Sequence, residues 1–112
     1  MATLKKAENF SKKVGAYTVI LENIGASSIT LEAIPFGPGE KPTQASDCPD
    51  DIEWLVDFVI VPGAASPTYR ISVDHLDAGK SLYIFDGKKC KKVANRAKVF
   101  ELGKTDPAVG IG

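Results

Sequence analysis

The chain has 112 residues, 44% of them hydrophobic and 25% charged, and its 14 cationic and 14 acidic residues give a formal net charge of zero at pH 7. This length fits one domain with a core of its own, and this composition excludes the disordered and fibrous classes. No apolar run approaches the roughly 20 residues that span a bilayer, and no apolar stretch follows Lys5 and Lys6. We therefore expect neither a transmembrane segment nor a signal peptide, and a location in the cytoplasm or in a virion.

The first part of the chain indicates a basic arm followed by two strands. Residues 1–13 are basic and show no period, so we interpret them as an N-terminal arm. From Val14 onward apolar and polar residues alternate with the period of β-strands. Tyr17–Asn23 and Ser28–Ile34 are separated by turn residues and predict a β-hairpin with Ile29 and Leu31 on its buried face.

The middle of the chain predicts a long loop and then a buried strand. Residues 35–51 contain four prolines and two glycines, which interrupt any ladder or helix, and a loop of this length is either functional or packed on a neighbour. Ile52–Val61 is rich in β-branched and aromatic residues, as expected of a central strand. Trp54 and Phe58 are four residues apart, which predicts that both side chains lie on the same face.

The last third predicts three strands and a tail. Tyr69–Val73 and Ser81–Phe85 are joined by residues 74–80, and Asp86-Gly87 indicates a turn. Lys89–Leu102 is expected to form one long strand whose buried side chains are Val93, Ala97 and Val99, with a helical start around Lys91–Lys98 as the alternative. Residues 105–112 are rich in turn formers and predict a C-terminal tail.

About six strands with no clear helix predict an all-β fold, a small antiparallel β-sandwich of Ig-like or jelly-roll-like type. The expected organisation is a basic arm over residues 1–13, the sandwich over 14–104 and the tail over 105–112. The strand–Asn-x-Gly–strand pattern of residues 19–31 and the Ala-Gly-Lys-Ser turn at 78–81 resemble those of many Ig-like and small viral structural β-sandwiches. This resemblance implies a fold and no functional residue.

Motifs for enzyme chemistry are not found. Asp77-Ala-Gly-Lys-Ser81 ends like a phosphate-binding loop, but it lacks the first glycine and a strand follows where a helix is needed. His75 is the only histidine, and no nucleophile motif accompanies it. Cys48 and Cys90 form no C-x-x-C pair, and the missing signal peptide favours two free thiols over one disulfide. We predict no cofactor, no metal and no enzymatic activity.

The charges are sorted along the sequence. Eleven of the fourteen cationic residues lie in residues 1–13 and 88–104, and eleven of the fourteen acidic residues lie in residues 14–87. No aromatic residue lies between Lys88 and Val99, which disfavours single-stranded nucleic acid as a partner, and the neutral net charge makes nucleic acid of any kind a less favoured partner. The pattern instead predicts docking between basic and acidic protein surfaces.

We therefore expect a non-enzymatic structural protein, a homo-oligomer or part of a larger shell such as a virus or phage capsid or tail. The expected docking residues are basic in the arm and the last strand, acidic in the loop, and apolar in the tail. They are Lys5, Lys6, Lys12, Lys13, Lys88, Lys89, Lys91, Lys92, Arg96 and Lys98; Asp47, Asp50, Asp51 and Glu53; and Val109 and Ile111. The alternative is a module that binds carbohydrate or calcium through residues 35–51 and Trp54.

Overall fold

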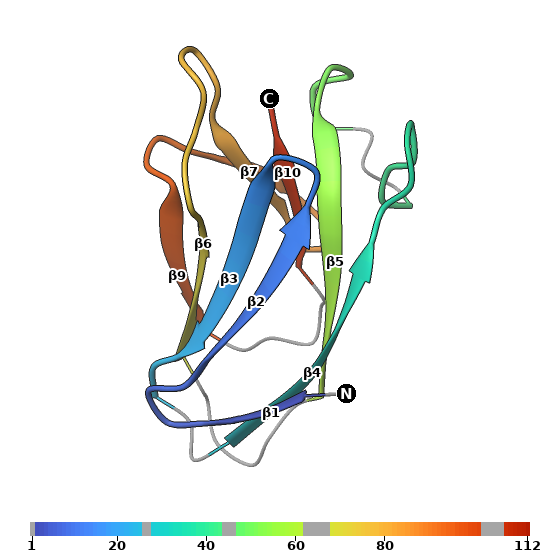
Figure 1. Cartoon of the computed structure of the whole chain (residues 1–112). Helices are drawn as coiled ribbons and strands as arrows, with labels where there is room; N and C mark the ends of the chain where they lie inside the picture. The colour runs from blue at the N-terminus through green and yellow to red at the C-terminus, as the bar shows by residue number, and fades with distance from the viewer. Residues whose placement is uncertain (1, 26–27, 44–46, 62–67, 102–106) are drawn as a thin grey trace.

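The computed structural model describes residues 2–25, 28–43, 47–61, 68–101 and 107–112, and these form two antiparallel β-sheets packed face to face (Figure 1). This confirms the predicted all-β sandwich. The described residues form ten strands where about six were expected. They are β1 (Ala2–Lys5), β2 (Asn9–Val14), β3 (Tyr17–Asn23), β4 (Ser28–Pro35), β5 (Glu53–Val61), β6 (Thr68–Val73), β7 (Leu82–Phe85), β8 (Cys90–Val93), β9 (Ala97–Glu101) and β10 (Ala108–Ile111).

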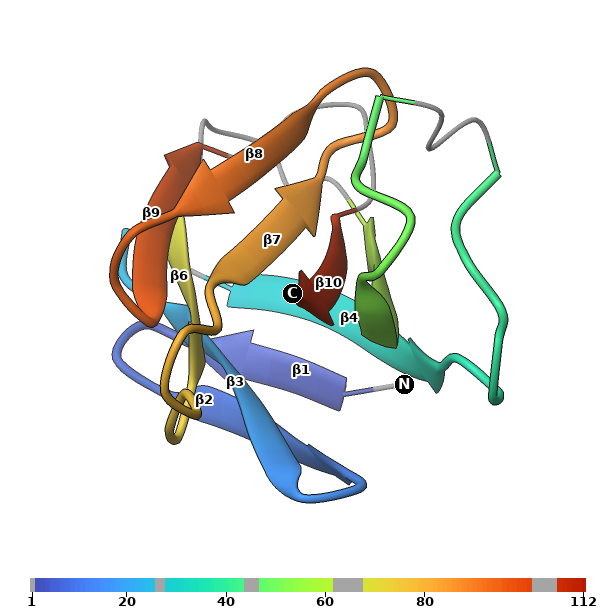
Figure 2. The ribbon, with the colours of Figure 1, turned by 90° about the horizontal axis from the view of Figure 1, so that it is seen from above.

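The larger sheet has the strand order β1-β4-β5-β10-β7-β8, and the smaller one has the order β2-β3-β6-β9. Figure 2 shows the two layers from above. Alternate side chains of each strand point into the space between the two sheets, where they are buried from solvent and form the main core. Fully buried members come from both sheets and include Val19, Leu21, Leu31, Phe58, Ile71 and Ile84. No helix long and apolar enough to cross a membrane occurs in the described ranges.

The predicted hairpin of residues 17–34 is wrong. β3 pairs with β2 and β6, whereas β4 pairs with β1 and β5 in the opposite sheet. Both strands do alternate as expected, because each turns one face toward the same core. Such a pattern shows which side chains are buried but not which strand lies alongside. The amides of Ile24 and Gly25 bond the carbonyl of Thr68 where the chain leaves β3.

The single strand expected over residues 89–102 is also wrong. A bend at residues 94–96 divides it into β8, an edge of the larger sheet, and β9, an edge of the smaller one. Val93 is buried as predicted, but Val99 is 51% exposed. Val99 lies opposite Arg70 in the register of β6 and β9, on the outer face of the sandwich.

The arm and the tail are strands, which corrects the expected organisation of the two ends. Residues 2–5 and 9–14 form β1 and β2, and the side chains of Leu4 and Phe10 pack on the main core. β10 lies between β5 and β7 in the larger sheet, with Val109 fully buried and Ile111 2% exposed. This strand was not recognised from the sequence because Ala108 and Gly110 alternate with its two large apolar residues and resemble turn formers. The expected boundary at residues 104–105 lies outside the described ranges.

A β-bulge in β5 separates Trp54 from Phe58. Val56 lies opposite Val109 and Trp54 lies opposite Gly110, so Leu55 is an extra residue on β5. Leu55 and Val56 both enter the main core, and the alternation is reset between them. Trp54 consequently lies on the outer face of the larger sheet, which overturns the expectation that it shares a face with Phe58.

Buried Asn23 ties the two sheets together at the end of the sandwich opposite the loop of residues 36–52. Its side-chain amide donates to the carbonyl of Leu4 on β1 over 3.0 Å, and its backbone groups bond Ala7 and Glu8 in the β1–β2 turn. The side chain is fully buried. It therefore satisfies polar groups that would otherwise lose their partners in the interior.

Replacing Asn23 with alanine should lower the free energy of unfolding by about 2–3 kcal/mol, because the buried carbonyl of Leu4 loses its donor and a small cavity forms. Urea denaturation followed by circular dichroism measures this. Thr3→Ala, which removes an exposed hydroxyl contact to Thr30 on the neighbouring strand β4, is the control and should cost less than about 0.5 kcal/mol. Equal effects of the two variants would refute the role given to Asn23.

Candidate functional site

A second apolar cluster lies on the outer face of the larger sheet. It contains Trp54, which is 7% exposed, and Phe85 and Ala108 from the neighbouring strands. Cys48 and Ile52 from the loop cover these side chains, and Phe36 packs at the edge. The loop of residues 35–51 was expected to be the least core-like segment of the middle, yet Phe36 and Cys48 from this loop, together with Ile52 just after it, cover this small core.

Gly110 is the reason that Trp54 can pack so closely on β10. A Cβ atom at Gly110 would lie 2.9 Å from Cε3 of Trp54 and 3.1 Å from the carbonyl oxygen of Glu53. Those separations are shorter than the ordinary contact distance of carbon atoms. Any side chain at this position would displace both the indole and the side chain of Ile52, whose Cγ2 atom would lie 2.5 Å from the added carbon.

A disulfide between Cys48 and Cys90 links the loop to β8. This corrects the expectation of two free thiols. The two residues are 42 positions apart in sequence, and the fold brings them together because the loop crosses the outer face of the sheet that ends in β8. The amide of Cys90 also donates to the carboxylate of Asp47 over 3.1 Å. The end of the loop is thus tied to the sheet by a covalent bond and a hydrogen bond.

A cleft of about 390 Å³ lies where this loop returns to β5. It is lined by residues 36–41, 48–50 and 52–54 and by Val14 at the end of β2. Phe36 and Trp54 stand with their ring centres 6.3 Å apart and their planes tilted by 58°. Concave sites of this size, with apolar rings and a few polar groups, are typical of ligand pockets.

The charges that line the cleft are mostly negative. Glu40, Asp50 and Glu53 contribute carboxylates, and Lys41 contributes one ammonium group. Glu40 is held in place because its carboxylate accepts the amide of Gly37 over 2.6 Å across a turn. In the described ranges no group of three or more histidine, cysteine or acidic residues is arranged to hold a metal ion. The predicted acidic loop therefore lies partly in the cleft, through Asp50 and Glu53.

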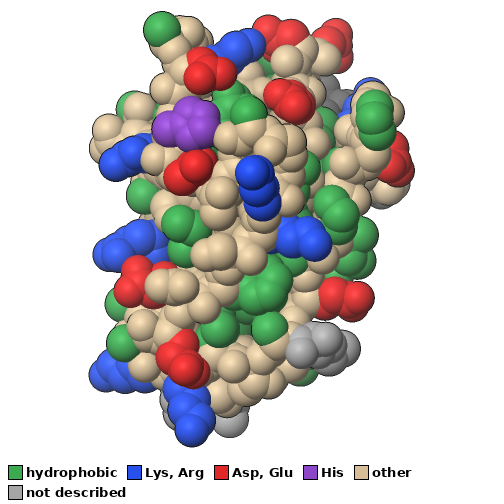
Figure 3. Space-filling model, in the orientation of Figure 1, with side chains coloured by type: hydrophobic (Ala, Val, Ile, Leu, Met, Phe, Trp, Pro, Cys, Tyr) green, Lys and Arg blue, Asp and Glu red, His purple; other side chains and the backbone are tan. Residues whose placement is uncertain are grey.

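Six of the ten predicted basic residues lie on the edge strands of the two sheets. β1 and β8 are the edges of the larger sheet and β2 and β9 those of the smaller. Each of these strands carries lysine, and the six residues concerned are Lys5, Lys12, Lys13, Lys91, Lys92 and Lys98. Lysines on edge strands discourage pairing with the edges of other molecules. Figure 3 shows blue side chains spaced along one face of the sandwich, where red ones interrupt them.

The β7–β8 turn is organised by Asp86. Its carboxylate accepts the amides of Lys88 and Lys89 over 2.9 and 2.8 Å, and the ammonium group of Lys91 lies 3.9 Å away. Burial raises the pKa of this carboxyl, but the two amides and Lys91 outweigh it and hold the pKa below its ordinary value of 3.8. The turn therefore keeps its shape while it presents Lys88 and Lys89 to solvent.

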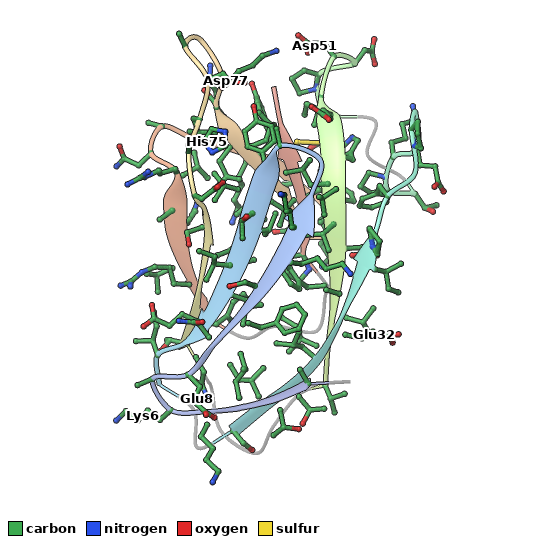
Figure 4. The ribbon with its side chains drawn as sticks, in the orientation of Figure 1. Lys6, Glu8, Glu32, Asp51, His75 and Asp77 are labelled. Carbon is green, nitrogen blue, oxygen red and sulfur yellow. A yellow bond between two sulfur atoms is a disulfide. The ribbon has the colours of Figure 1, made fainter. Side chains whose placement is uncertain are left out.

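The structure brings some of the predicted docking residues together and separates others. Asp47 reaches the backbone of β8 within one molecule, so part of the charge pattern is intramolecular. Lys6 and Asp51 lie at opposite ends of the sandwich (Figure 4). Arg96 donates to the carbonyl of Asp74 in the β6–β7 connection. Val109 and Ile111 are buried in the core of their own chain and cannot anchor into a neighbour, which corrects that prediction.

His75 takes part in a polar cluster at the upper end of the sandwich in Figure 4, near Asp77. Its Nδ1 lies 3.1 Å from a carboxylate oxygen of Asp74, and its ring stacks on Tyr17 with the ring centres 4.9 Å apart. Tyr17 donates its hydroxyl to Asp77 over 2.8 Å. Burial, and then this bond to a carboxylate, raise the pKa of the phenol, so it stays neutral. None of these four residues lines the cleft, and the cluster fastens the β6–β7 connection to β3.

No family model matches this chain, and neither a curated protein nor a solved structure does. No residue role can therefore be carried over from a relative. The candidate site rests on the geometry of the cleft.

Residues 35–51 and Trp54, the binding segment of the alternative prediction, supply most of the lining of the cleft, but sequence reasoning did not single out Phe36 or Lys41 within that loop and missed Gly110. Phe36 stands among prolines and glycines, a context that predicts an exposed turn. A signal was nevertheless present, because a phenylalanine in a long loop near a tryptophan is costly to expose and indicates a covered patch.

Replacing both Cys48 and Cys90 with serine should lower the free energy of unfolding by about 2–4 kcal/mol, because the unfolded chain regains the freedom of a loop of 42 residues. Guanidinium denaturation of the oxidised protein and the variant measures the difference. Reduction of the native protein should give a similar loss. A variant as stable as the native protein would show that no such bond forms.

Replacing Gly110 with alanine should cost about 2–3 kcal/mol of stability and shift the fluorescence of Trp54 toward longer wavelength, because the new methyl group displaces the indole from the sheet. Trp54 is the only tryptophan, so the emission reports this site alone. Gly79→Ala in the β6–β7 connection is a control outside the sheet and the cleft, where the backbone is strained but the added methyl meets no neighbour. It should change stability without shifting the emission.

Proposed function

We propose that the protein is a non-enzymatic binding module whose cleft beside β5 receives a basic, partly apolar segment of a partner protein. The observation that supports this most strongly is the composition of the cleft. Three acidic residues, one lysine and two aromatic residues contribute to the lining of a space of about 390 Å³. A lysine or arginine side chain matches such a lining, because its stem is apolar and its end is cationic.

The way in which the loop is held supports the same function. The disulfide, the hydrogen bond from the Cys90 amide to Asp47 and the small core around Trp54 hold residues 47–52 in place before any ligand arrives. A site that is already ordered loses less entropy on binding. Docking through the tail has less support, since Val109 and Ile111 are buried in their own chain.

A carbohydrate is the second candidate ligand, and the aromatic pair Phe36 and Trp54 is the observation that favours it. Sugars stack on aromatic faces, but the indole of Trp54 is only 7% exposed and offers little of its face. A cationic ligand also uses the carboxylates of Asp50 and Glu53, which a neutral sugar does not need. The basic segment is therefore the preferred ligand.

The disulfide also bears on where the module acts. Such bonds persist in oxidising compartments and on virion or cell surfaces and are rare in the reducing cytoplasm. The bond between Cys48 and Cys90 supports an oxidising location, and among the two locations expected from the sequence it favours the virion over the cytoplasm.

The test is a titration of the native protein with an eight-residue peptide of alternating lysine and leucine, followed by the emission of Trp54. We expect saturable binding that weakens at least about tenfold in Asp50→Asn/Glu53→Gln, because the cleft loses two of its three carboxylates. Raising the salt concentration should weaken binding as well.

Glu32→Gln is the matched control, since it removes a carboxylate from the exposed face of β4 outside the cleft. This variant should bind the peptide as the native protein does. An emission that responds to neutral oligosaccharides and not to the basic peptide would favour the second candidate. If neither ligand changes the emission of Trp54, the proposed site is refuted.

A further inference from the structure

We propose that the basic segment that enters the cleft is the β7–β8 turn of a second copy of this chain, so that two copies form a closed dimer. This inference rests on the proposed function of the cleft and names its partner. The turn comprises residues 86–89, and Lys91 and Lys92 follow on β8.

The β7–β8 turn has the chemistry that the cleft requires. Lys88, Lys89 and Lys92 are exposed, and the described residues contain no ion pair to their side chains. Only Lys91 lies near a carboxylate, at 3.9 Å from Asp86. Because Asp86 holds the turn through the two lysine amides, the ammonium groups are presented from an ordered backbone.

The turn lies beside the cleft of its own molecule without entering it. Cys90 is joined to Cys48, which lines the cleft, yet no residue of β7 or β8 is part of the lining. Figure 2 shows the β7–β8 turn next to the segment that leads back to β5. A molecule with an acidic hollow and a basic projection side by side is complementary to itself. A two-fold axis between them places each projection in the hollow of the other copy.

Pairing of two sheets through β8 is the competing way for two copies to associate. It would bring Lys91 and Lys92 of one copy against lysines of the other along an antiparallel ladder, and like charges directly opposite each other are unfavourable. Insertion of the turn into the cleft instead brings lysines against Asp50 and Glu53. Charge repulsion therefore disfavours pairing through β8, and charge attraction favours insertion of the β7–β8 turn into the cleft.

The experiment compares the mass of four full-length proteins by sedimentation velocity at low salt. They are the native chain, Lys88→Glu/Lys89→Glu, Asp50→Lys/Glu53→Lys, and the combination of all four changes. We expect a dimer for the native chain that dissociates as salt rises, because screening weakens the charge pairs. Each double variant should raise the dissociation constant at least about tenfold, and the combined variant should restore it to within about threefold, because the charges are exchanged and not removed.

Lys5→Glu/Lys6→Glu is the control, because it makes the same change of charge at the opposite end of the sandwich (Figure 4). It should dimerise as the native chain does. A native chain that is monomeric at every concentration and salt level would refute the inference. So would a combined variant that stays monomeric while its circular dichroism spectrum and melting temperature match those of the native chain.

Failure of the dimer and failure of the cleft can be told apart with a peptide of residues 86–93 that carries serine in place of Cys90. If the native chain is monomeric but the lysine–leucine peptide changes the emission of Trp54, the cleft binds basic segments and only the identity of the partner is wrong. If neither peptide binds, the proposed function fails together with the inference. Binding of the 86–93 peptide that competes with dimerisation would support both.

Discussion

One extra residue in β5, the bulged Leu55, determines how the loop and the candidate site are arranged. Because Leu55 has no opposite residue in β10, the strand changes face and Trp54 comes to lie outside the main core. An indole buries about 150–250 Å² when it is covered, so leaving it on an open sheet would be unfavourable. The loop of residues 36–52 provides the cover, and the cleft is the space that remains beside that cover. The bulge is therefore the origin of the candidate site.

Most of the strands can be predicted from the sequence, but few of the pairings between strands can. Alternation in residues 17–23, 28–34 and 69–73 correctly indicates strands with one buried face. The same alternation arises whether the next strand lies alongside or across the core, so the sheet order could not be derived from it. β10 escaped notice for a different reason. Strands buried on both faces need small residues where another layer approaches, and Ala108 and Gly110 look like turn formers when read alone.

The site was predictable in part and for reasons of charge. Asp50 and Glu53 stand out in the sequence as members of an acidic cluster, and both line the cleft. The disulfide could not be foreseen, since two cysteines 42 residues apart meet only after a chain reversal that no local pattern encodes. The sorting of charge along the chain proved to have a topological cause. The basic segments are those that form the outermost strands, whereas the acidic middle supplies the inner strands and the loop.

The position of β10 has a consequence for the order in which the protein can fold. β5 and β7 are both neighbours of β10 and are not paired with each other, so β7 and β8 join the larger sheet only through the segment 108–111. A ribosome makes that segment after all the other strands. The sheet therefore cannot close before residues 108–111 have been made, and until then the edges of β5 and β7 that pair with β10 stay open to wrong partners.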